Sequence, residues 1–109
     1  MNWQIQFLPE AEKDFKKLDG SQRILVQKAL KKVSTNPLPI SEGGYGKPLG
    51  NHNKTHLSNL LKVKLKDAGI RIVYTLIQTN TEMLIIVIGA RKDETAYIQA
   101  QHRVQKYHL

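Results

Sequence analysis

A short run in which lysines alternate with apolar residues is the first feature that could carry chemistry. It reads Leu61-Lys62-Val63-Lys64-Leu65-Lys66. Because successive side chains of a β-strand point to opposite faces, one face of this run is buried and the other carries a row of ammonium groups. Most faces of this kind are simply solvated, so the functional interpretation depends on what lies across from the lysines.

The hairpin after this run decides which side chains face the lysines. A two-residue loop at Asp67-Ala68 pairs residue 65 with 70 and places Arg71 directly across from Lys64, whereas a three-residue loop would change the register. Like charges opposite one another cost some tenths of a kcal/mol to about 1 kcal/mol, and such local rules are most often broken at functional sites. We therefore interpret Lys62, Lys64 and Arg71 as a cationic cluster suited to a phosphate and to the negative charge that develops on it during transfer.

Two further candidates follow the most apolar run of the chain. The run Leu84-Ile85-Ile86-Val87-Ile88 predicts an interior strand, because it is apolar at every position. Arg91 lies at the end of this strand and Tyr97 lies near the start of the next helix, so both side chains can face the cluster. Each also has an ordinary interpretation, as a capping or ion-paired arginine and as an amphipathic tyrosine.

The other polar residues do not indicate a second site. The histidines lie in an irregular connection or near the C-terminus, away from the cluster, at His52, His56, His102 and His108. The acids of the second half show neither paired spacing nor histidine companions, at Asp67, Glu82, Asp93 and Glu94. The chain has no cysteine, which excludes disulfides, thiolate metal sites and a cysteine nucleophile. We expect no metal ion and no other cofactor.

The elements that position these residues predict an α+β fold. A strand is expected at about 2–8, strand-like runs at about 60–66, 70–78 and 83–89, and a short C-terminal helix at about 93–104. The spacing of the last helix predicts that it carries Ala96, Ala100 and Val104 inward. Two helices lie between Pro9 and Asn36; Ser21 is the expected cap of the second, and its apolar positions are Ile24, Leu25, Leu30 and Val33. The predicted order is β-α-α-β-β-β-α, with an antiparallel sheet.

Length and composition predict a single domain. The 109 residues suffice for one modest core, so residues 1–109 are interpreted as one unit. Residues 37–59 hold much of the proline and glycine and form a long irregular connection. Its glycine-rich piece Gly43-Gly44-Tyr45-Gly46-Lys47 predicts a turn rather than a phosphate loop, because Pro48 stands where a metal-binding Ser or Thr would be needed.

Charge and hydropathy restrict the partners and the location. The net charge of +8 predicts affinity for a polyanion, either a nucleic acid or an acidic protein surface. The N-terminus lacks the pattern of a secretion signal, and the longest apolar run, 83–88, is far too short to span a bilayer. The sequence therefore predicts a cytoplasmic protein without a membrane partner.

Several segments together resemble one protein family, the RelE branch of the RelE/ParE toxins. The first helix resembles the family at Phe7-Leu8-Pro9-Glu10-Ala11-Glu12-Lys13-Asp14-Phe15-Lys16-Lys17-Leu18, and the connection into the sheet at Gly46-Lys47-Pro48-Leu49. The sheet resembles it at Lys62-Val63-Lys64, Gly69-Ile70-Arg71-Ile72-Val73-Tyr74 and Ile88-Gly89-Ala90-Arg91-Lys92, with Tyr97 six residues after Arg91. The Gly-x-Arg-x-x-Tyr element is common to the superfamily, whereas the two lysines, two arginines and late tyrosine indicate RelE-like ribonucleases.

The resemblance implies a RelE-like toxin fold, an activity and a site. The site would be Lys62, Lys64, Arg71, Arg91 and Tyr97, and the reaction would be attack by an RNA 2′-hydroxyl on the adjacent phosphate of ribosome-bound mRNA, without a metal. Arg71 and the lysines would neutralise the phosphate, Lys64 or Tyr97 would assist removal of the 2′ proton, and Arg91 would stabilise or protonate the leaving oxygen.

The resemblance also implies partners. They are an acidic antitoxin, mRNA on the ribosome, and contacts with ribosomal RNA. Few large apolar residues follow Tyr97, so we expect the last helix to be held weakly and to be covered or displaced by the antitoxin.

Two other functions remain open at this point. A ParE-like inhibitor of DNA gyrase would explain the fold and Arg71 but would leave the other cations without a role. A noncatalytic basic module that only binds nucleic acid is compatible with the charge, but the aromatic content of 6% does not favour a stacking platform for free single strands.

Overall fold

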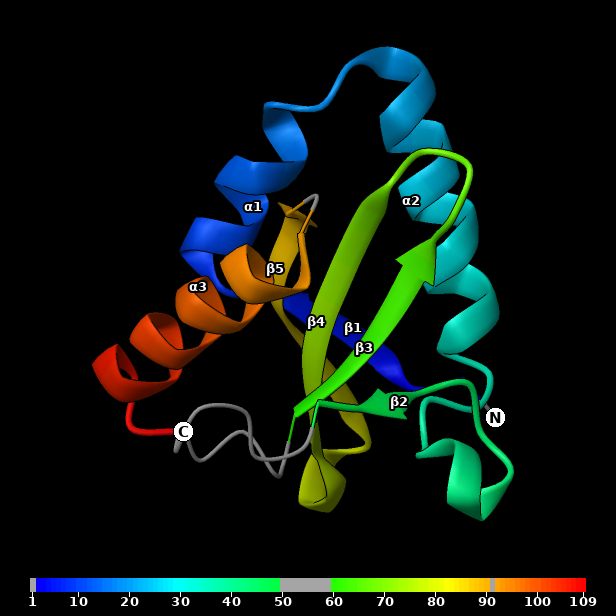
Figure 1. The fold of residues 1–109 in the computed structure, drawn as a ribbon. Helices are drawn as coiled ribbons and strands as arrows, with labels where there is room; N and C mark the ends of the chain where they lie inside the picture. Colours follow the sequence, from blue (N-terminus) through cyan, green and yellow to red (C-terminus); the bar gives the residue numbers. More distant parts are fainter. Residues whose placement is uncertain (1, 50–59, 91) are drawn as a thin grey trace.

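The computed structural model describes residues 2–49, 60–90 and 92–109, and these form an α+β fold (Figure 1). The described strands are β1 (Gln4–Phe7), β2 (Lys47–Pro48), β3 (Leu60–Leu65), β4 (Ile70–Ile77) and β5 (Glu82–Ala90). The α-helices are α1 (Pro9–Lys16), α2 (Gly20–Val33) and α3 (Asp93–Lys106), with 3₁₀ turns η1 (Ile40–Glu42) and η2 (Gln78–Asn80). The predicted fold class is confirmed, with the additional short strand β2.

The sheet is mixed rather than wholly antiparallel, which corrects the prediction. Its strand order is β1-β5-β4-β3-β2, and β1 pairs in parallel with β5, with Gln4 opposite Glu82 and Phe7 opposite Ile85. The other described pairs are antiparallel. The chain leaves β1 through two helices instead of a tight turn, so β1 does not pair with the next strand in sequence and instead completes the free edge of β5.

The core lies around β5, which is the interior strand that its apolar run predicts. Ile85, Ile86 and Val87 are fully buried. Helix α3 contributes buried Ala96 and Ala100, as expected from its spacing. In the view of Figure 1, α1 and α3 lie to the left of the sheet and α2 lies to its right.

Helix α2 differs from the sequence prediction in its cap and its buried face. The N-cap is Asp19, which accepts a hydrogen bond from the Gln22 backbone and forms a reciprocal capping box, so Ser21 is not the cap. Ile24 and Leu25 are 53% and 45% exposed, and the buried positions of α2 are Val26, Leu30 and Val33. With three consecutive apolar residues, the sequence alone does not decide which of them faces the core.

Within the described residues, no helix combines the length and the apolar character needed to cross a bilayer.

Candidate active site

The hairpin between β3 and β4 has the predicted two-residue register. Lys64 is paired with Arg71, and Leu65 with Ile70. Directly opposite residues of an antiparallel pair share a face, with Cα atoms about 4.5–5.5 Å apart. The Lys64 side chain is exposed, whereas Arg71 is only 8% exposed. The two cations therefore share one face of the sheet, Lys64 exposed and Arg71 largely buried.

Tyr97 joins this cluster through Lys62. The Lys62 ammonium donates a hydrogen bond of 3.0 Å to the Tyr97 phenol oxygen, and its Nζ lies 5.4 Å from the centre of the ring. The contact links β3 to the first turns of α3, across 35 positions of the chain. Lys62 and Lys64 are two residues apart on β3, so the structure brings Lys62, Lys64, Arg71 and Tyr97 to the same face.

Arg91, the fifth candidate, lies outside the described residues. Its neighbour in sequence, Ala90, is the last residue of β5 and pairs with Arg71. The last residue of β5 is therefore paired with a residue of the cationic cluster. His52 and His56 also lie outside the described residues, and within the described residues no three or more His, Asp or Glu side chains form a group that could hold a metal ion.

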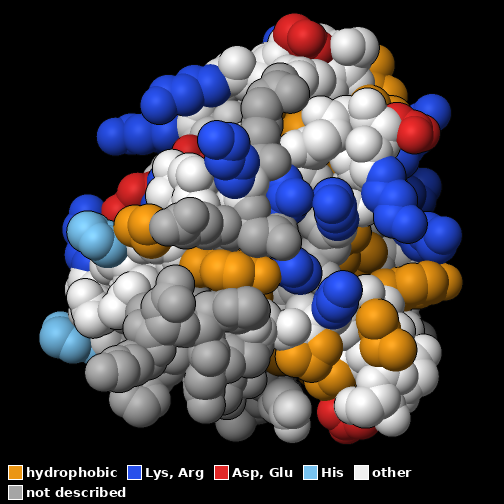
Figure 2. Space-filling view, in the orientation of Figure 1, with side chains coloured by type: hydrophobic (Ala, Val, Ile, Leu, Met, Phe, Trp, Pro, Cys, Tyr) orange, Lys and Arg blue, Asp and Glu red, His pale blue; other side chains and the backbone are white. Residues whose placement is uncertain are grey.

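The sheet adds one lysine to the candidates predicted from the sequence. Lys47 of the short strand β2 is paired directly with Lys62 and its side chain is exposed. Strand β2 has only two residues, too few for any periodicity, so no pattern in the sequence predicted this pairing. The cationic cluster thus extends across three neighbouring strands, and lysine and arginine side chains gather over this part of the molecule and beside α2 (Figure 2).

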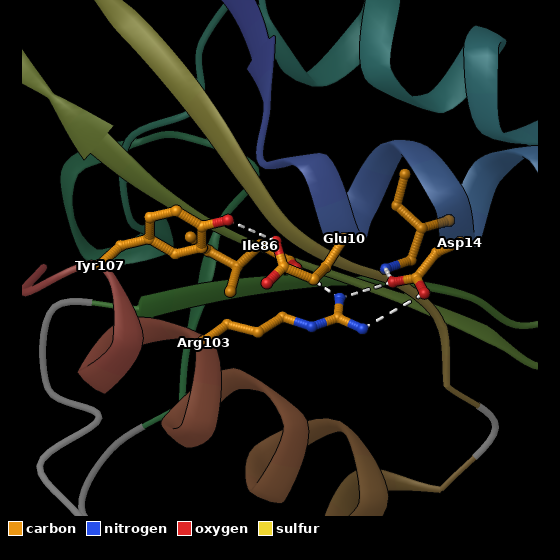
Figure 3. A network of polar contacts seen from close by, with 6 residues as sticks. Glu10, Asp14, Ile86, Arg103 and Tyr107 are labelled. Atoms are coloured by element: carbon orange, nitrogen blue, oxygen red, sulfur yellow. Dashed lines mark hydrogen bonds and ion pairs between the residues drawn. The ribbon is translucent and has the colours of Figure 1, made fainter.

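Helix α3 is fastened to the rest of the molecule at its C-terminal half by an ion pair between Arg103 and Asp14 of α1. The guanidinium donates hydrogen bonds of 2.7 and 3.3 Å to the two carboxylate oxygens and one of 2.7 Å to the Ile86 carbonyl (Figure 3). The same carboxylate accepts a bond of 3.1 Å from the Ile88 backbone. The two side chains are 15% and 14% exposed, so this network is largely removed from water.

A second contact between the same helices lies one turn away at Glu10. Its carboxylate accepts hydrogen bonds of 2.9 Å from Lys106 and 2.8 Å from Tyr107. These bonds favour the charged carboxylate and lower the pKa of Glu10 from 4.5 to about 2. The same hydrogen bonds stabilise the protonated forms of the two donors. The pKa of Lys106 and that of Tyr107 are therefore raised, mainly by the hydrogen bond to Glu10.

The prediction of a weakly held α3 did not include these polar contacts, which fasten its C-terminal half to α1. Few large apolar residues follow Tyr97, and that pattern gives no indication of the polar attachment. A signal was present: Glu10 and Asp14 are four residues apart on α1, and Arg103 of α3 is four residues before Tyr107, the C-cap of that helix. Residues at this spacing share a helix face, so two acids can meet two donors when the helices lie side by side.

Loss of the Glu10 carboxylate is expected to change the response of stability to acid. A carboxyl group with a lowered folded pKa stabilises the protein above its unfolded pKa, here about 4.5, and this contribution disappears as the pH falls toward 2. Melting temperatures of the wild type and Glu10→Gln, measured by circular dichroism between pH 7 and pH 2, should differ most at pH 7 and converge near pH 2.

The control for this prediction is Glu12→Gln on the same helix. The Glu12 carboxylate lies 3.4 Å from the Lys16 ammonium, and both side chains are well exposed. Loss of the Glu12 charge should therefore leave the acid profile of the wild type unchanged. Parallel acid profiles for the wild type and Glu10→Gln would contradict the assigned role of Glu10.

The comparisons with known proteins converge on one group. No protein-family model matches the chain. The chain is 28% identical over 105 residues to an Escherichia coli protein described as RelE-like toxin protein, covering 96% of this chain and 100% of that protein. It is 26% identical over 104 residues to the mRNA interferase toxin RelE of Escherichia coli K12, covering 95% and 99%.

Solved structures of the same group share the fold. A variant of Escherichia coli toxin RelE in the free state superposes with a TM-score of 0.72 at 23% identity, covering 95% of this chain and 99% of that one. The toxin of the intact Escherichia coli RelBE toxin-antitoxin complex superposes with a TM-score of 0.64 at 23% identity, covering 83% and 98%. The expected RelE-like fold is thus confirmed along most of the chain.

Proposed function

We propose, from the premise that this chain is RelE-like in sequence and in fold, that it is the toxin of a type II toxin-antitoxin system and an endoribonuclease that cleaves mRNA on the ribosome. The observation that carries this proposal is the convergence of Lys62, Lys64, Arg71 and Tyr97 on one face of the sheet. The relatives named mRNA interferase support the same chemistry.

The proposed reaction is attack by a 2′-hydroxyl oxygen on the adjacent phosphorus, with departure of the 5′ oxygen of the next nucleotide. The products are a 2′,3′-cyclic phosphate and a 5′-hydroxyl. Arg71, Lys62 and Lys64 neutralise the negative charge that grows on the phosphate oxygens, which is the kind of preorganised electrostatic stabilisation that lowers such barriers most. No metal ion takes part in this proposal.

The proton transfers are assigned to the remaining candidates. Lys64 or Tyr97 receives the 2′ proton, and the hydrogen bond from Lys62 fixes the Tyr97 oxygen beside the cations. Arg91 stabilises or protonates the leaving oxygen. The ribosome is needed because a side chain with the properties of a histidine base is not part of the described cluster, so orientation of the substrate must supply much of the acceleration.

The proposed partners are an acidic antitoxin, mRNA and ribosomal RNA, and the proposed location is the cytoplasm. The solved complexes of RelE with RelB support the first partner. The net charge of +8 supports both kinds of polyanion. Residues 1–109 are proposed to act as one domain.

The test is cleavage by the purified protein of one mRNA in two states, free and bound in a ribosomal complex. Ribosome-bound mRNA should be cut at least about 100-fold faster than free mRNA, and the products should carry 2′,3′-cyclic phosphate ends. EDTA added after assembly of the ribosomal complex, in buffer whose magnesium is adjusted to keep the ribosome intact, should leave the rate within about twofold. Equal cutting of free RNA would contradict dependence on the ribosome.

A cell-based readout separates this proposal from the gyrase alternative. Synthesis of the protein should stop translation while DNA supercoiling stays normal. Intact mRNA together with gyrase-dependent DNA breaks would favour the ParE-like function instead.

A further inference from the structure

An exposed tyrosine next to the cationic cluster is not used by the proposed reaction. Tyr45 lies on the connection before β2, and its side chain is 45% exposed. The Nζ atom of Lys32, on α2, lies 5.3 Å from the centre of its ring. Two residues later, Lys47 is paired with Lys62 of the cluster. An exposed aromatic ring with Lys32 beside it therefore lies two residues from Lys47, which joins it to the candidate active site.

The backbone around Tyr45 is held firmly. The Tyr45 amide donates a hydrogen bond of 3.0 Å to the Asn36 carbonyl, and the Gly46 amide donates one of 3.0 Å to the Leu38 carbonyl. Beneath this segment, the buried Tyr74 hydroxyl donates a bond of 2.8 Å to the Pro37 carbonyl. A Cβ at Gly44 would overlap the Leu38 carbonyl, so only glycine fits this packing.

A fixed backbone with an outward aromatic ring is the arrangement that a stacking platform requires. Bases stack on aromatic side chains whatever their identity, while nearby Lys and Arg hold the phosphates. A platform on a fixed backbone loses little conformational freedom when a base binds. Hydrophobic side chains adjoin the lysines over β2 and the segment before it (Figure 2).

We infer that Tyr45, flanked by Lys32 and Lys47, forms a stacking subsite for one unpaired base of the RNA strand that is being cut. The inference rests on the proposed function. Lys47 holds the phosphate between this base and the cationic cluster, and Tyr45 fixes the base itself. One platform beside a cluster differs from the series of aromatic residues that binds free single strands, which the low aromatic content does not favour.

The occupant is an RNA base rather than the antitoxin because the site combines an exposed aromatic ring with cations, Lys32 beside the ring and Lys47 two residues along the chain. An acidic protein segment would use the cations but would gain less from the exposed ring face than a flat nucleobase does. Substrate RNA and ribosomal RNA offer the same chemistry, so the experiment must separate them.

The experiment measures kcat and KM for ribosome-bound mRNA with the wild type, Tyr45→Ala, Tyr45→Phe and Lys47→Gln, with Lys13→Gln on α1 as the charge-matched control. Tyr45→Ala should raise KM by about tenfold or more and leave kcat within about threefold, because stacking acts on binding. Tyr45→Phe keeps the ring and should match the wild type. Lys47→Gln should raise KM, and it should reduce the slope of log affinity against log salt concentration by the amount that about one phosphate contact contributes. Lys13→Gln should leave KM within about twofold.

A set of mRNAs with one abasic nucleotide at successive positions around the cut identifies the stacked base. One position should raise the wild-type KM as much as Tyr45→Ala does, and the two changes combined should have no further effect. Independent effects at every position would overturn the subsite. Weaker binding of Tyr45→Ala to ribosomes without mRNA would also overturn the subsite, because it would assign the ring to ribosomal RNA. A loss confined to antitoxin binding would overturn it as well.

The design also separates the subsite from the proposed function. If the wild type cuts no mRNA, the proposed function fails. If the wild type cuts mRNA and folded Tyr45→Ala has an unchanged KM, the subsite alone fails. Circular dichroism melting of Tyr45→Ala and Tyr45→Phe establishes that both variants are folded.

Discussion

Lys64→Gln is expected to lower the rate of mRNA cleavage by about 10²–10³-fold, the loss usual when one preorganised charge is removed from a transition state. The same change should leave the free energy of unfolding unchanged or raise it by some tenths of a kcal/mol to about 1 kcal/mol, because it removes a like charge directly opposite Arg71. Single-turnover cleavage of ribosome-bound mRNA and denaturant unfolding measure the two effects on one preparation.

The opposite directions of these two effects make the prediction specific. If Lys64 were only structural, its replacement would lower both stability and activity. If it were only solvated, its replacement would change neither. Lys66→Gln, at the end of the same run, removes the same charge from a residue that lies beyond the Lys64–Arg71 pair, and should leave cleavage within about threefold. Normal cleavage by Lys64→Gln would remove this lysine from the candidate site.

Asp14→Ala is expected to have the largest effect on stability, about 3 kcal/mol, because it leaves the largely buried Arg103 guanidinium without its carboxylate partner. It also removes the acceptor of the Ile88 amide. The loss should extend to cleavage, since α3 carries Tyr97 to Lys62 and this ion pair fastens the helix to α1.

A double-mutant cycle with Arg103→Met separates the ion pair from the packing of each side chain. The double variant should be no less stable than Asp14→Ala alone, because it leaves no uncompensated charge. Glu12→Ala is the control on the same helix, where the exposed contact with Lys16 should contribute less than about 1 kcal/mol. A loss below about 0.5 kcal/mol for Asp14→Ala would show that the network does not hold α3.

Patterns within short stretches of the sequence were enough to predict the features that depend on neighbouring residues. The alternation of lysines with Leu61, Val63 and Leu65, together with a two-residue loop, was enough to predict that Lys64 faces Arg71. The unbroken apolar run of β5 predicted its interior place, and the Ala96 and Ala100 spacing predicted the buried face of α3. These relations are local, because strand alternation, hairpin register and helix periodicity are set by a few consecutive residues.

The folded structure was needed to establish the contacts between distant segments. It placed Lys47 opposite Lys62 through a strand too short to have a pattern, and it paired β1 with β5 in parallel. It also brought Tyr97 to Lys62 and Arg103 to Asp14, which are 35 and 89 positions apart. Polar pairs of this kind leave little trace in a hydrophobic pattern, because charged residues look alike in sequence whether they face water or one another. Their partners are fixed only when the packing of the core brings the helices and strands side by side.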